Sequence, residues 1–114
     1  MDKVFLGWTR EKVKKDMENL SRFFIAAEND ARITATHILI YLALFECWNL
    51  NQFQNPVFIS RRIIMRMTKI HSITTYHKYI KELDQFGYIG YEPSYRTKMG
   101  TRVWVNENVG TAFV

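Results

Sequence analysis

Residues 60–86 read SRRIIMRMTKIHSITTYHKYIKELDQF, and this stretch decides the fold. It predicts a short helix, a tight turn at residues 69–71 and a longer amphipathic helix that ends before Gly87. Ser60 and Ser72 are the expected N-caps of the two helices, because a serine side chain can accept a hydrogen bond from an unpaired backbone N–H. Two helices joined by so short a turn form a helix-turn-helix motif.

The second of these helices has two faces of opposite character. Ile73, Tyr76, Ile80 and Leu83 recur every three or four residues, which predicts a face that packs on a core. The opposite face carries short hydroxyls and cations, which can reach base edges and phosphates in the major groove of DNA. The candidate DNA-binding residues on this helix are Ser72, Thr74, Thr75, His77, Lys78 and Lys81.

The net charge of +5 lies entirely in the second half of the chain. Residues 1–57 hold seven basic and seven acidic residues, whereas residues 58–114 hold nine basic and four acidic ones. No acidic residue occurs between Glu46 and Glu82. A neutral half joined to a basic half indicates a polyanion-binding surface on the second half. The alternative is a solvated basic face that has no partner.

Two more helices and a strand are expected before this stretch. A helix capped by Thr9 should reach about residue 28, and a second helix capped by Thr34 should reach about residue 51. The second helix is apolar nearly all the way round, so it should be buried on most sides. His37, near its start, is expected to be a structural residue rather than a ligand. A short strand is expected at residues 57–59.

The helix that follows Thr9 carries a heptad-like apolar seam that continues to Ala27. It either covers the core of the domain or pairs with the same helix of a second copy. Phe23 and Ile25 widen its apolar face beyond what one core contact requires, which favours a homodimer. The candidate dimerisation residues are Val13, Met17, Leu20 and Phe24.

After Gly87 the sequence pattern changes from helical to alternating. Residues 88–92 and 101–105 each alternate their side chains between two faces, which predicts two strands. The turn-rich segment between them carries two cations. A two-stranded hairpin is therefore expected to follow the second helix of the motif.

This order of elements resembles the winged helix-turn-helix family over about residues 33–106. The resemblance is carried above all by residues 75–89, TYHKYIKELDQFGYI, where a glycine ends the helix and an apolar residue opens the wing. Residues 40–49 and 56–61 further resemble small winged-helix proteins of bacterial conjugative transposons and related mobile elements.

The resemblance implies an α+β fold that is mostly α. Its parts are a three-helix core with a short strand and a two-stranded wing. An N-terminal helical extension at residues 1–32 would precede this domain, and a C-terminal tail at residues 107–114 would follow it.

The resemblance also implies sequence-specific binding of double-stranded DNA, by a transcriptional regulator or by an accessory factor in excision or replication of a mobile element. The second helix of the motif would enter the major groove, and the wing would reach neighbouring backbone or minor groove. Thr74 and Thr75 are the best candidates for reading bases, and Lys78 and Lys81 for meeting phosphates. The flanking backbone would be held by Arg61, Arg62, Arg66 and Lys69, and from the wing by Arg96, Lys98 and Arg102.

Two other binding functions stay open beside duplex DNA. An aromatic, basic surface can bind RNA by stacking, but the available rings, Tyr79, Tyr95 and Trp104, are scattered over three elements. Winged helices also serve as protein-interaction modules. Such a module would present an apolar or mixed-charge face, whereas the face found here is hydroxylic and basic.

The sequence predicts neither an enzyme nor a cofactor, metal or small-molecule site. The five glycines are dispersed, so no phosphate-cradling loop is expected. His71 and His77 have no cysteine or close carboxylate to complete a metal site. Cys47 has no partner for an intrachain disulfide, which favours a reduced, cytoplasmic setting. The longest uncharged apolar run, residues 38–45, is too short to span a membrane.

Overall fold

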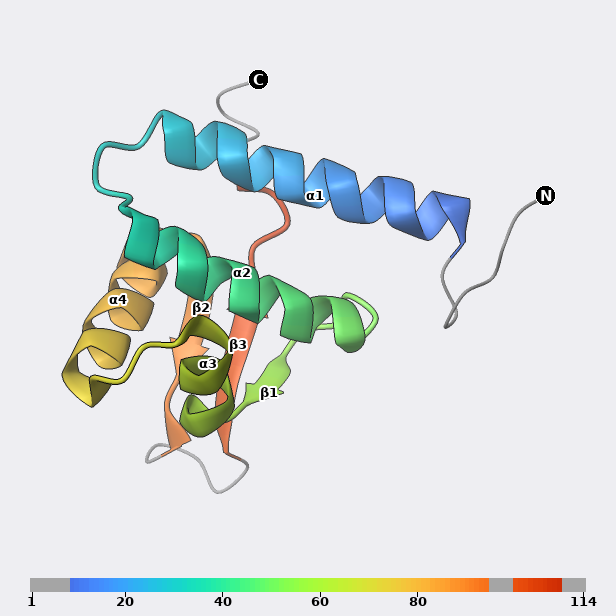
Figure 1. Cartoon of the computed structure of the whole chain (residues 1–114). Helices are drawn as coiled ribbons and strands as arrows, with labels where there is room; N and C mark the ends of the chain where they lie inside the picture. Colours follow the sequence, from blue (N-terminus) through green and yellow to red (C-terminus); the bar gives the residue numbers. More distant parts are fainter. Residues whose placement is uncertain (1–8, 95–99, 110–114) are drawn as a thin grey trace. The chain divides into compact units, whose positions relative to one another are not determined.

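The computed structural model describes residues 9–94 and 100–109. Within them it has four helices and a three-stranded antiparallel sheet (Figure 1). This confirms the expected α+β class with mostly helical content. No helix of the described residues is both long and apolar enough to cross a membrane. Two of the predicted DNA-binding residues, Arg96 and Lys98, lie outside the described residues, as does Tyr95.

The chain divides into two compact units, one formed by Met1–Ala31 with Glu107–Val114 and the other by Arg32–Asn106. The first unit contains helix α1, Arg10–Glu28. The Thr9 side chain accepts a hydrogen bond from the Lys12 N–H at 3.1 Å, which confirms Thr9 as the N-cap of this helix.

The second unit is built around helix α2, Ala35–Leu50, which follows its N-cap Thr34. Helix α2 packs against the two later helices and against two of the three strands (Figure 1). Its buried side chains are His37, Ile40, Tyr41, Ala43, Leu44, Phe45 and Trp48. They cover most of the circumference of the helix, as its apolar sequence predicts.

The sheet is formed by β1 (Val57–Ile59), β2 (Ile89–Glu92) and β3 (Thr101–Val105), in the order β1-β3-β2. The predicted hairpin is therefore β2 with β3, and β1 is a third strand that pairs with the other edge of β3. Val103 is the centre of the register, since it pairs with Val57 on one side and with Tyr91 on the other. The valines at positions 57, 103 and 105 are buried, so the sheet contributes one apolar face to the core.

A side chain extends the pairing of β1 with β3 beyond the strand itself. The Asn55 amide donates to the Val105 carbonyl oxygen at 3.0 Å and accepts from the Val105 N–H at 3.0 Å. These two bonds imitate a backbone pair of an antiparallel ladder. They hold the loop before β1 against the end of β3.

The central motif consists of α3, Arg61–Thr68, and α4, Ile73–Gln85. The Ser60 side chain accepts from the Ile63 N–H at 3.4 Å, and the Ser72 side chain accepts from the Thr75 N–H at 3.1 Å. Both predicted caps are thus confirmed. Lys69 adopts the left-handed conformation with φ 62° and ends α3, and Gly87, with φ 87°, follows the end of α4.

The core-facing side of α4 is shorter than its sequence pattern predicts. Tyr76, Ile80 and Leu83 are buried, whereas Ile73 is 49% exposed. The prediction that Ile73 packs on the core is therefore wrong. Ile73 is the first residue of the helix, and the buried row begins one turn later at Tyr76.

Candidate nucleic-acid interface

A groove runs along the outer face of α4, and we call it the basic groove. It has a volume of about 960 Å³ and lies between the start of α3, the outer face of α4 and the adjoining ends of β2 and β3. Four of its lining residues are cations: Arg61, Arg62, Lys78 and Lys81. Serine and threonine hydroxyls line it as well, from Ser60, Thr74, Ser94 and Thr101. No aspartate or glutamate is among its lining residues.

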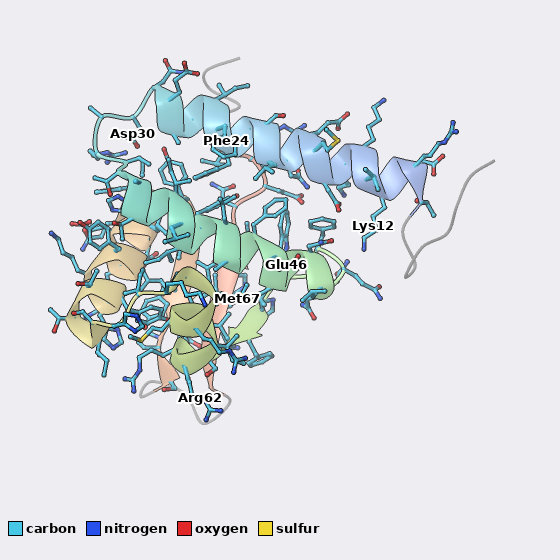
Figure 2. All side chains as sticks on the ribbon, in the orientation of Figure 1. Lys12, Phe24, Asp30, Glu46, Arg62 and Met67 are labelled. Carbon is cyan, nitrogen blue, oxygen red and sulfur yellow. The ribbon has the colours of Figure 1, made fainter. Side chains whose placement is uncertain are left out.

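A second groove, which we call the turn groove, lies along α3 and the turn between α3 and α4. It has a volume of about 540 Å³, and its cationic lining residues are Arg61, Arg62, Arg66 and Lys69. His71 lines it too, and again no carboxylate does. Figure 2 shows Arg62 projecting from the ribbon of α3, where its side chain is exposed.

Most of the predicted DNA-binding residues thus gather on two neighbouring grooves. Thr75 is the exception on α4, because it is half-buried and does not line the basic groove. Its neighbour Thr74 is exposed and does line it. Ser72 is exposed, but its hydroxyl already accepts the capping hydrogen bond.

Arg102 differs from the other predicted cations because its charge is already compensated. The register places Arg102 of β3 opposite Glu92 of β2. The Arg102 Nε donates to Glu92 Oε1 at 2.7 Å, and Nη2 contacts the same oxygen. Its guanidinium also lies 5.3 Å from the centroid of the Trp104 ring. A paired cation of this kind adds less positive potential than the unpaired residues of α4.

The hairpin residues that line the basic groove are not among those predicted from sequence to bind DNA. Tyr91, Pro93, Ser94 and Thr101 all line it, and the Ser94 N–H donates to the Thr101 hydroxyl at 3.1 Å. The signal was present as hydroxyl groups at the ends of the two predicted strands. Placing them beside α4 requires the packing of β2 on α4, which sequence spacing does not give.

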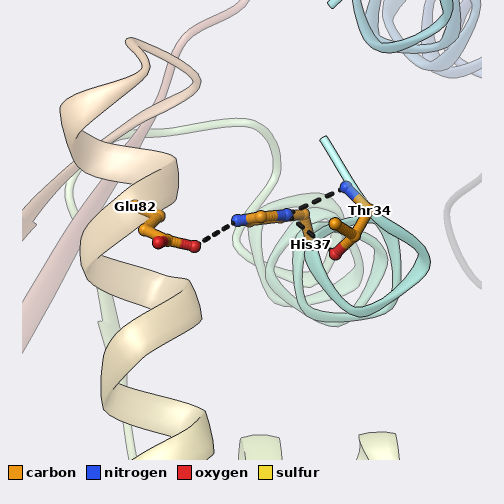
Figure 3. Close-up of polar contacts among 3 residues, drawn as sticks. All are labelled: Thr34, His37 and Glu82. Atoms are coloured by element: carbon orange, nitrogen blue, oxygen red, sulfur yellow. Dashed lines mark hydrogen bonds and ion pairs between the residues drawn. The ribbon is translucent and has the colours of Figure 1, made fainter. Parts of the chain in front are cut away.

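Helix α4 is fixed to α2 by a buried histidine (Figure 3). His37 is 2% exposed, and its Nδ1 accepts from the Thr34 N–H at 3.0 Å. Because Nδ1 acts as an acceptor, the ring proton is on Nε2, which donates to Glu82 Oε1 at 2.8 Å. The Tyr79 ring packs edge-on against the imidazole at 4.6 Å between centroids. This confirms His37 as a structural residue.

His77 on the opposite side of α4 has a different environment. It lines the basic groove, yet its Nδ1 is buried and has no hydrogen-bond partner within the described residues. Burial lowers the pKa of His77 below its ordinary value of 6.5, and the neighbouring charges of Lys81 and Arg61 lower it further. The imidazole is therefore neutral at pH 7 and has one unsatisfied polar atom.

The predicted dimerisation seam on α1 is largely open to solvent. Val13, Met17 and Phe24 are 40%, 65% and 43% exposed, and Leu20 is half-buried; Phe24 is labelled in Figure 2. Phe23 is completely buried. The sequence predicts that Phe23 widens the exposed apolar face, and its burial shows that it does not.

Comparison of the chain with protein-family models, with curated proteins and with solved structures finds no match. The described residues also include no group of three or more histidine, cysteine, aspartate or glutamate side chains placed to hold a metal ion.

Proposed function

We propose that residues 32–106 form a winged helix-turn-helix domain that binds double-stranded DNA, with α4 as the helix that enters the major groove. The observation that carries the proposal is the composition of the basic groove. It combines four cations with four serine or threonine side chains and has no carboxylate among its lining residues. Duplex DNA offers the complementary surface, because closely spaced phosphates flank base edges that accept and donate hydrogen bonds.

The element order supports the same proposal. A helix, a short strand, two helices and a two-stranded hairpin follow one another in the second unit. The hairpin lines the groove beside α4, where a wing would meet the backbone next to the major groove. The cap at Ser72 and the bond between His37 and Glu82 hold α4 at both its beginning and its far end.

Within this proposal the side chains divide into two roles. Thr74, exposed in the first turn of α4, is the candidate for reading a base edge. The cations at Lys78 and Lys81 and at the start of α3 meet phosphates on either side, and these contacts position the protein without reading sequence. Arg66 and Lys69 extend the phosphate-binding surface along the turn groove.

Duplex DNA is favoured over RNA because Tyr79 and Trp104, the two candidate rings among the described residues, are poorly placed for stacking. The Tyr79 ring packs on the buried His37. The guanidinium of Arg102 lies over the Trp104 ring, 5.3 Å from its centroid. Neither ring lines the basic groove. The rings that do line it belong to Tyr76, which is buried, and to His77 and Tyr91, which are half-buried. The groove therefore offers no fully exposed ring on which unpaired RNA bases could stack. A protein partner is disfavoured because the four charged side chains of the groove are all cations, whereas protein interfaces are depleted of charge at their centres.

By its resemblance to proteins of conjugative transposons, we propose that the chain serves a mobile element, as a transcriptional regulator or as an accessory factor in excision or replication. Selecting the genomic fragments that the protein binds distinguishes these roles. Sites over a promoter support regulation, and sites at the ends of an integrated element support excision. Fragments bound at random positions would contradict both.

We also propose that two copies pair through α1 in an antiparallel manner. The seam at Val13, Met17 and Phe24 leaves apolar surface in water, which pairing removes. Lys14 and Glu28 are fourteen residues apart along the same edge of this seam. In an antiparallel pair this edge of one helix lies beside the same edge of the other helix, running in the opposite direction. Lys14 of one copy therefore lies across from Glu28 of the other.

Solution scattering tests the pairing. Met17→Glu together with Leu20→Glu should convert a dimer into a monomer, because each substitution places a carboxylate in the apolar seam. Lys15→Glu, an exposed position outside the seam, is the control and should remain dimeric. A wild-type protein that is already monomeric at high concentration contradicts the proposal.

Titration of a labelled duplex at several salt concentrations tests DNA binding itself. Affinity should be micromolar or tighter at low salt and should fall steeply as salt rises, because about four to six phosphates per copy release counterions. Absence of binding at low salt would refute the proposed function. Equal affinity for a single strand of the same sequence would favour the RNA-type alternative instead.

A further inference from the structure

Ile73 is a large apolar side chain left exposed in the middle of the cationic surface. It is 49% exposed and lines both the basic groove and the turn groove. Of the residues that line either groove, only Ile73, Arg61 and Arg62 line both. Other exposed apolar side chains nearby in sequence, such as Phe58 and Ile63, line neither.

The position of Ile73 is well defined by its neighbours. It follows the N-cap Ser72 directly and is the first helical residue of α4. The hydrogen bonds from the Thr75 N–H to the Ser72 hydroxyl and from the Tyr76 N–H to the Ser72 carbonyl fix the backbone on both sides of it. A β-branched side chain has one strongly preferred rotamer in a helix. Ile73 therefore presents a rigid apolar surface.

The surroundings of Ile73 restrict what can cover it. A partner surface must bring negative charge to Arg61 and Arg62 and an apolar group to the position between the two grooves. The major groove of duplex DNA offers both, because phosphates flank it and the 5-methyl group of thymine is an apolar contact on its floor. An acidic protein surface would need an apolar side chain placed between its carboxylates to match both features, whereas the major groove supplies phosphates and a methyl group wherever a thymine occurs.

We propose that Ile73 contacts the 5-methyl group of a thymine in the major groove and thereby sets sequence preference at that base pair. This inference rests on the proposed DNA binding and adds a specificity-determining residue to it. Thr74, beside it on the same turn, reads hydrogen-bonding groups, whereas Ile73 reads a methyl group. The preferred site should therefore contain at least one thymine whose methyl group matters.

Deoxyuridine substitution tests this contact directly. A preferred duplex is first selected from a randomised pool, and each thymine is then replaced singly by deoxyuridine, which removes the methyl group and keeps all hydrogen bonds. At one position the wild-type affinity should fall about fourfold, the value expected for one buried methyl group. Ile73→Ala should bind the thymine duplex more weakly and should show no further loss at that position.

Two control variants sharpen the comparison. Ile63→Ala removes the same side chain from an exposed position on α3 outside both grooves, and it should keep the full response to deoxyuridine. Ile73→Val keeps a β-branched surface and should keep most of the response. The far-ultraviolet circular dichroism spectrum of each variant establishes that the helices are intact.

The outcomes separate this inference from the proposal on which it rests. If the wild-type protein binds duplex DNA but responds to deoxyuridine at no position, the methyl contact is refuted and DNA binding stands. The contact is equally refuted if Ile73→Ala responds as strongly as the wild-type protein. If the wild-type protein binds no duplex at low salt, the proposed function falls and the contact falls with it.

Discussion

Two histidines lie on opposite sides of α4, and their environments differ in every respect that matters for a polar group. His37, which packs against α4 from α2, is buried with both ring nitrogens bonded, to Thr34 and to Glu82. His77 projects from α4 into the basic groove, and its buried Nδ1 has no partner within the described residues. The histidine on one side of α4 has its hydrogen bonds satisfied within the described residues, and the histidine on the other side does not.

The two histidines therefore mark a side of α4 that is held against α2 and a side of α4 that is presented in the basic groove. Buried polar atoms in folded proteins are almost always hydrogen-bonded, and an exception calls for an explanation. The His37 side meets that rule through contacts that join residues 34, 37 and 82. The His77 side departs from it within a surface whose cations repel one another. A surface that carries such a cost is typical of a binding site rather than of a supporting core.

Removing His37 should produce the largest change in stability. In His37→Ala the Thr34 N–H and the Glu82 carboxylate both lose their partner, and a cavity remains between α2 and α4. We expect the free energy of unfolding to fall by about 3 kcal/mol, measured by urea denaturation. Glu82→Gln is the milder variant, because the amide oxygen can still accept from Nε2, and about 1 kcal/mol is expected.

The comparison with His77 provides the control for that experiment. His77→Ala should lower the free energy of unfolding by less than about 1 kcal/mol, since no hydrogen bond of Nδ1 is lost. If His77→Ala destabilises the protein as much as His37→Ala does, the division of α4 into a held side and a presented side is wrong.

Removing two cations from the presented side should weaken DNA binding without affecting stability. Lys78→Ala with Lys81→Ala should lower affinity for every duplex by about tenfold or more at low salt, and should reduce the salt dependence by about two counterions. Both side chains are exposed, so the urea midpoint should not change. The matched control is Lys12→Ala with Lys15→Ala, which removes the same charge from α1. Equal losses for the two pairs would show that only net charge matters.

Much of the fold follows from sequence because its signals are local. The caps at Ser60 and Ser72 and the turn at Lys69 lie within a few residues of the helix ends that they define. Strand alternation in residues 101–105 likewise depends on neighbours alone. Local rules of this kind correctly placed every helix and strand of the described residues within a few positions.

The errors and omissions arise where distant residues meet. His37 and Glu82 are 45 positions apart, and the pairing of Arg102 with Glu92 depends on the register of two strands. Periodicity showed which side of α4 faces inward, but not how far the core extends along the helix, so Ile73 was assigned to the core. The same limitation hid the hairpin hydroxyls, whose place in the basic groove depends on tertiary packing.

The smallest expected effect concerns the pH dependence of His77. Its pKa in the free protein lies below 6.5 because of burial, Lys81 and Arg61. Phosphates brought into the basic groove would favour the protonated imidazole and raise this pKa, so DNA binding should be accompanied by proton uptake. Affinity should therefore increase as the pH falls from 8 toward 5, by about two- to threefold beyond the response of His77→Gln.

Acidification should change folding stability in the opposite direction to DNA affinity at the same residue. The folded-state pKa of His77 is depressed, so the unfolded chain binds the proton more tightly, and stability contributed by neutral His77 is lost as the pH falls below 6.5. In the absence of DNA, acidification should thus destabilise the wild-type protein slightly more than His77→Gln. Parallel titrations of binding and of unfolding distinguish the two effects. If affinity and stability both fall with acid, phosphates do not approach His77, and the DNA lies elsewhere on the domain.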